Sequence, residues 1–93
     1  MPSLKVAHVR QQGIDLIIAP LEHDFGYKTL QDQQEIVGEI QMRSRSAGLA
    51  GTVVPVWDSG GRMSFIAPQK WHPFFQSLSL RAVWANVNQE ISW

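Results

Sequence analysis

The sequence of 93 residues contains no cysteine and has no net charge, since eight Lys and Arg balance eight Asp and Glu. Without cysteine the chain can form no disulfide, thiolate metal ligand or cysteine nucleophile. Zero net charge argues against sequence-independent DNA binding, which needs a large basic field. It also leaves little electrostatic repulsion between copies of the chain.

Long apolar runs are missing as well. The longest, residues 16–21, is too short to span a bilayer and contains Pro20. The first five residues lack the charged start and apolar stretch of a signal peptide. We therefore expect a cytoplasmic protein of bacterial or phage type with no membrane partner.

Polarity patterns predict two β-hairpins. Residues 4–11 alternate in polarity, and residues 14–21 are a β-branched apolar run that suits a strand covered on both faces. A second pair of strands is expected at residues 51–57 and 62–67. Proline cannot donate to a strand ladder, so Pro20 should mark a strand end or an edge. Pro55 should likewise mark an edge strand or a bulge.

A first helix is predicted to begin at Thr29, whose hydroxyl can cap it, and to stop at Gly48. An apolar stripe that begins with Leu30 follows the helical period and should face the core. Gly38 lies inside this helix, where it either allows close approach to the sheet or is tolerated at a cost of about 1 kcal/mol.

The second helix follows the clearest amphipathic spacing in the chain, residues 80–91, with Ser77 or Ser79 as its cap. A short helical turn is expected before it, at residues 71–75. Together with the hairpins, these helices give the order ββαββα.

This order predicts one α+β domain over residues 1–93, a two-layer sandwich. Its four-stranded, mainly antiparallel sheet carries two helices on one face. Residues 1–48 and 49–93 share a weak self-similarity, which reused turn residues explain equally well. The hairpins hold more apolar side chains than one helical layer can cover, so we expect an exposed apolar sheet face.

An exposed apolar face indicates binding rather than catalysis. We expect a non-enzymatic binding or assembly module that forms a homodimer and uses neither cofactor nor metal. Aromatic side chains contribute much of the energy of interfaces. The predicted contact residues are Trp57, Phe65, Trp71 and Phe74. The alternative is that these aromatics form the core of the domain itself.

A small hydrolase or nuclease is the first alternative function. His23 beside Asp24 has the composition of a general base with its carboxylate, and Arg62 and His72 complete the candidate set. Catalysis would require these side chains to meet in one cleft. A solvated polar loop is the simpler interpretation of the His-Asp pair.

A nucleic-acid-binding protein is the second alternative. Arg10, Arg62 and Lys70 supply positive charge, and tryptophans could stack on bases. The chain has no RNA-binding aromatic signature and no Gly-rich phosphate loop, and no residue pattern identifies a protein family. Nucleic acid is therefore not the expected partner.

Overall fold

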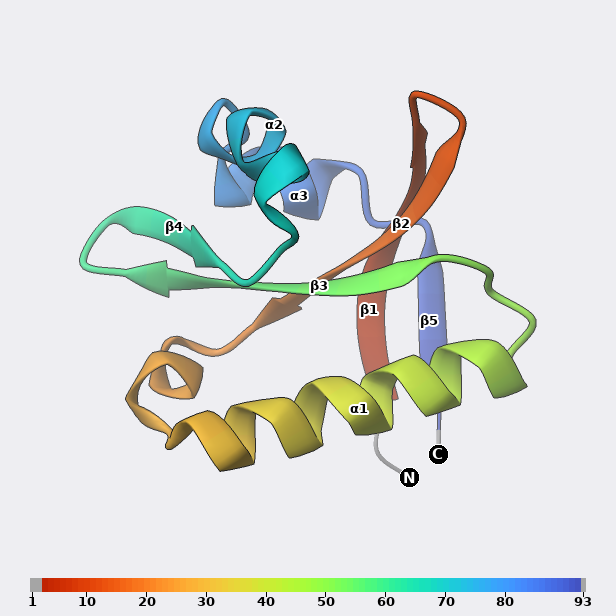
Figure 1. Ribbon diagram of the computed structural model, residues 1–93, viewed down its shortest axis with the longest axis horizontal. Helices are drawn as coiled ribbons and strands as arrows, with labels where there is room; N and C mark the ends of the chain where they lie inside the picture. The colour runs from red at the N-terminus through yellow and green to blue at the C-terminus, as the bar shows by residue number, and fades with distance from the viewer. Residues whose placement is uncertain (1–2, 93) are drawn as a thin grey trace.

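The computed structural model describes residues 3–92 of the chain. One mixed sheet is formed by β1 (Ser3–Gln11), β2 (Ile14–Leu21), β3 (Thr52–Ser59), β4 (Arg62–Phe65) and β5 (Gln89–Ser92). The order across the sheet is β4-β3-β2-β1-β5 (Figure 1). β2 and β3 are parallel, and all other neighbours are antiparallel.

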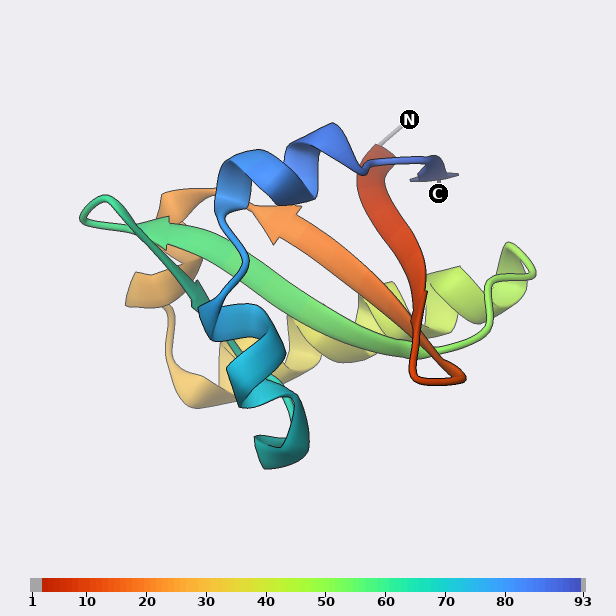
Figure 2. The ribbon, with the colours of Figure 1, turned by 90° about the horizontal axis from the view of Figure 1, so that it is seen from above.

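Helices lie on both faces of this sheet, as Figures 1 and 2 show from two directions. One face is covered by α1 (Leu30–Ser46) and, at the end of β3, by the short 3₁₀ helix η1 (His23–Tyr27). The other face is covered by η2 (Gln69–Trp71), α2 (His72–Gln76) and α3 (Leu80–Ala85). The chain is an α+β fold with the sheet as its middle layer.

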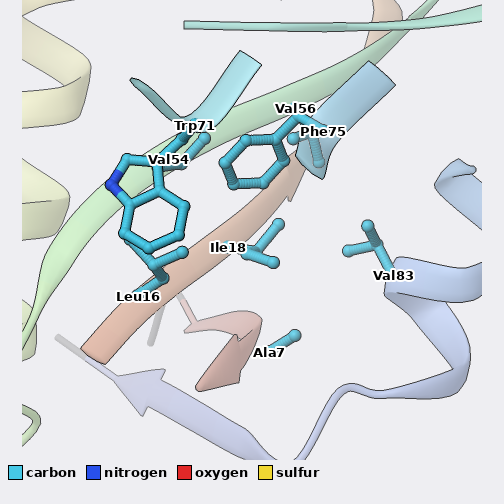
Figure 3. Packing of buried hydrophobic residues seen from close by; sticks show 8 residues of the cluster. All are labelled: Ala7, Leu16, Ile18, Val54, Val56, Trp71, Phe75 and Val83. Atoms are coloured by element: carbon cyan, nitrogen blue, oxygen red, sulfur yellow. The ribbon is translucent and has the colours of Figure 1, made fainter. Parts of the chain in front are cut away.

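The alternation of side chains along the central strands builds two separate cores. On the α2 and α3 side, Leu16 and Ile18 pack with Phe75 (Figure 3). On the α1 side, the intervening Ile17 packs with Ile40 of the helix. The prediction that residues 14–21 form a strand covered on both faces is therefore confirmed.

The prediction of two helices on one face is wrong. The apolar residues on both sheet faces do need cover, but the chain provides it by dividing its helices between the faces. Over residues 3–92 the expected exposed sheet face is thus replaced by two covered ones.

The four-stranded sheet and the helix over residues 80–91 are also corrected. α3 ends at Ala85, where Asn86 caps it, and asparagine favours such ends over helix interiors. Ile91 belongs instead to the fifth strand, pairs with Leu4 of β1 and is 1% exposed in the α1-side core. The spacing of eleven residues between Leu80 and Ile91 fits the helical period. Ile91 nevertheless lies in a strand, because its segment pairs with β1.

The two prolines have different outcomes. Pro20 lies next to the end of β2, as predicted, and beyond Ile18, the last residue of β2 that pairs with β1. Pro55, expected in an edge strand or a bulge, lies in β3, which has β2 and β4 as neighbours, at the point where the pairing with β4 stops. The Pro55 carbonyl accepts the Ile66 N–H at 3.2 Å, just after β4 ends. Because Pro55 has no N–H, the β3–β4 ladder lacks at most one hydrogen bond, the last one at this end.

Two side-chain amides extend the sheet where its outer strands are too short. Asn88 accepts the His8 N–H at 2.8 Å and donates to the His8 carbonyl at 2.9 Å, just before β5 begins. Across the sheet, Gln41 of α1 accepts the Val53 N–H at 3.0 Å and donates to the Gly51 carbonyl at 2.9 Å. An amide offers a donor and an acceptor as a peptide group does, so each side chain replaces part of a missing neighbouring strand.

We expect Asn88→Ala to lower the free energy of unfolding by about 1–2 kcal/mol, because it removes two hydrogen bonds to β1. Asn86→Ala is the matched control, since that amide donates only one bond, to the Ala82 carbonyl. The Asn86→Ala variant should lose clearly less free energy of unfolding, as measured by urea denaturation. Equal losses would show that Asn88 does not stabilise the edge of β1.

Candidate functional site

Trp57 and Trp71, two of the four predicted contact aromatics, are buried in the cores of the chain itself. Trp57 is 8% exposed at the end of β3, and its ring centroid lies 4.9 Å from that of Phe25 in η1. Trp71 is 5% exposed and packs with Phe75 against the other sheet face (Figure 3). In a single chain, neither indole presents a large surface to a partner.

Phe65 and Phe74 are half-buried, and the rings of both lie next to that of Phe75. The ring centroid of Phe75 lies 5.3 Å from that of Phe65 and 5.1 Å from that of Phe74. Phe74 also meets Trp71 edge to face at 6.4 Å. These contacts join β4, η2 and α2 into one aromatic cluster. Phe65 additionally lines a cleft between β4 and the α2–α3 segment.

The four predicted polar site residues lie apart. His23 and Asp24 are exposed on η1, on the α1 side of the sheet. His72 lies on the opposite side at the start of α2, and Arg62 is exposed at the turn between β3 and β4. Within residues 3–92 no hydrogen bond joins any two of them, and no three His, Asp or Glu side chains could hold a metal ion. The geometry therefore offers the catalytic alternative no shared cleft.

Two of the histidines hold loops in place. His72 Nε2 lies 3.0 Å from the Ala67 carbonyl, in the segment that follows β4. His8 Nε2 lies 2.8 Å from the Ala50 carbonyl, in the loop between α1 and β3. Because a carbonyl only accepts hydrogen bonds, the Nε2 atom of each ring carries the proton. The sequence did not predict these bonds, since each depends on a loop being folded back onto the ring.

The cations of the nucleic-acid alternative are dispersed. Arg10 is near the tip of the β1–β2 hairpin, whereas Arg62 is at the tip of the β3–β4 hairpin, and Figure 1 shows these tips at opposite ends of the sheet. Lys70 belongs to η2, where its Nζ lies 5.7 Å from the Trp71 ring. The three side chains therefore form no common basic surface.

The structure exposes apolar side chains that the sequence did not predict to be exposed. Among residues 3–92, the large exposed ones are Ile14, Tyr27, Leu30, Met42, Ile66 and Trp84. Leu30, expected in the core-facing stripe of the first helix, is 67% exposed, and Ile66 is 42% exposed. Both line a groove of about 390 Å³ between α1 and the part of β3 that β4 does not pair with, which we call the α1 groove.

The α1 groove is uncharged. Its described lining consists of Leu30, Gln33, Gln34, Val37, Gly38, Gln41, Thr52, Val53 and Ile66. Gly38 does not pack against the sheet, because a Cβ built on it would meet no atom within 4 Å. The helix backbone at Gly38 is thus accessible from this groove.

Neither relatives nor a membrane segment indicates a function. Comparison of the chain with models of protein families, with curated proteins and with solved structures found no match. Over residues 3–92, no helix combines the length and apolarity needed to cross a membrane. The surfaces of the chain are therefore the basis for assigning a function.

The same substitution at two glycines should have opposite effects. A Cβ at Gly26 of η1 would lie 2.6 Å from Trp57 Nε1, so Gly26→Ala must displace the buried indole and should cost about 1–3 kcal/mol of stability. Within a single chain, Gly38→Ala meets no atom and improves helix propensity, so at concentrations where the chain is monomeric it should add about 0.5–1 kcal/mol of stability. Urea denaturation measures the free energy of unfolding of both variants. A Gly26→Ala variant as stable as the unaltered chain would contradict the packing of η1 on Trp57.

Proposed function

We propose that this chain is a small non-enzymatic binding or assembly module that acts as a homodimer. The supporting observation is the α1 groove, which places Leu30 and Ile66 in water on opposite sides of an uncharged surface. A two-fold dimer brings identical patches together. A charged patch would repel its own copy, whereas this one has no charge to oppose self-association.

The contact surface in this proposal lies on α1 rather than on the sheet. Leu30 and Ile66 supply exposed aliphatic surface, and burying that surface in a dimer removes it from water. Gln34 is exposed and lines the same groove, and its amide can both donate and accept, so the two copies can pair through the same side chain.

Gly38 allows close approach in this arrangement. With no side chain and no neighbouring atom within 4 Å, it lets a second backbone come near the middle of α1. Two α1 helices related by a two-fold axis would therefore cross near Gly38, with Leu30 of each copy close to the α1 groove of the other.

Mass measurement by light scattering and sedimentation over a wide range of concentration tests the dimer. Leu30→Glu and Ile66→Glu should each weaken dimerisation by about 30-fold or more, because each buries a carboxylate and sets like charges across the two-fold axis. The matched control is Ile14→Glu, which alters an isoleucine of similar exposure, 40%, near the β1–β2 turn.

The control variant should dimerise as the unaltered chain does. Urea denaturation of all three variants shows whether they remain folded. A monomeric unaltered chain at the highest concentration would overturn the homodimer. A dimer that Ile14→Glu weakens as much as Leu30→Glu does would move the interface away from the α1 groove.

A further inference from the structure

A second cavity lies on the opposite face of the sheet from α1. It is a cleft of about 620 Å³ between the β3–β4 hairpin and the α2–α3 segment, and Figure 1 shows the hairpin extending beside these helices. We call it the hairpin cleft. Its volume lies within the range of roughly 300–1,000 Å³ that is typical of small-molecule sites.

Apolar side chains from both walls line the hairpin cleft. Met63 and Phe65 come from β4, Leu78 precedes α3, and Leu80 is the first residue of α3. All four are half-buried, because each packs against the core around Phe75 while part of its surface remains in the cleft. This anchoring holds the apolar lining in position.

Two arginines stand at the cleft from opposite walls. Arg62 belongs to β4 and Arg81 to α3, and neither guanidinium makes a hydrogen bond or an ion pair with any residue in the range 3–92. Asp58 is the only carboxylate among the described lining residues, and its Oδ1 accepts the Gly61 N–H at 3.1 Å. Two positive charges and one negative charge leave the lining with one net positive charge.

We propose that the hairpin cleft binds a small organic carboxylate with an apolar body. The guanidinium groups of Arg62 and Arg81 would bind the carboxylate through charge-assisted hydrogen bonds, and Met63 and Phe65 would contact the apolar part. A carboxylate carries one negative charge, which the lining balances, whereas a phosphate monoester carries nearly two. This site does not depend on the α1 groove or on dimerisation.

The test uses 4-phenylbutyrate as the probe and 4-phenylbutan-1-ol as its uncharged analogue, followed by ¹H–¹⁵N NMR titration. Phenylbutyrate should shift the amide signals of residues 61–65 and 78–81. The alcohol should bind the same residues about tenfold more weakly, because it forms no charge-assisted bond with the arginines.

Charge variants separate the role of the arginines from that of the apolar lining. Arg62→Gln combined with Arg81→Gln should weaken phenylbutyrate binding about tenfold and leave alcohol binding unchanged. Asp58→Asn keeps an oxygen for the Gly61 N–H and removes the opposing charge, so it should tighten phenylbutyrate binding about twofold to fivefold. Arg45→Gln, at the exposed end of α1, is the control for net charge and should have no effect.

Several results would overturn the proposal. They are the absence of shifts in the hairpin cleft, equal affinity for acid and alcohol, and an Arg45→Gln effect as large as that of the double variant. The Leu30→Glu variant should bind phenylbutyrate normally, since its substitution lies on the other side of the sheet. Failure of either proposal therefore leaves the other standing.

Discussion

The parallel pairing of β2 with β3 at the centre of the sheet determines how the rest of the chain is arranged. Its register runs from Leu16 beside Thr52 to Leu21 beside Trp57. Parallel neighbours need a crossover, and the crossover here is α1, which covers only one face. Because β2 and β3 are apolar on both faces, the C-terminal helices must cover the other. Two cores and two helical layers follow from this one pairing.

Local signals in the sequence predicted the elements that depend on local structure. The hydroxyl of Thr29 accepts the Asp32 N–H at 3.2 Å at the start of α1, and Gly48 has a positive φ of 81° just after its end. Both hairpins also formed where they were expected. What the sequence could not supply was the placement of these elements, because the face on which a helix lies depends on which strands pair. β5 shows this clearly, since its residues pair with residues of β1 that are 83 to 89 positions away along the chain.

The candidate site residues were harder to predict for a related reason. Residue type selected Trp57 and Trp71, but a tryptophan in so small a domain serves equally well as core, and both are buried. Leu30 fitted the core stripe by its spacing, yet it lies in the first turn of α1, where its side chain is mostly in water. Arg62 was selected for a catalytic set, whereas its structural neighbours are the apolar residues of the hairpin cleft. A side chain's chemistry was visible in the sequence, but its neighbours were not.

In the proposed dimer, the edges of the sheet favour contact through helices over contact through strands. The outermost strands, β4 and β5, have only four residues each, which gives a second chain little edge to extend. Farther along, the exposed edges of β1 and β3 are occupied by the amides of Asn88 and Gln41. With both faces covered over residues 3–92 and these edges bonded, the apolar surface available to a partner lies mainly on loops and helices. Gln41 connects the two features, because the same side chain closes the edge of β3 and lines the α1 groove.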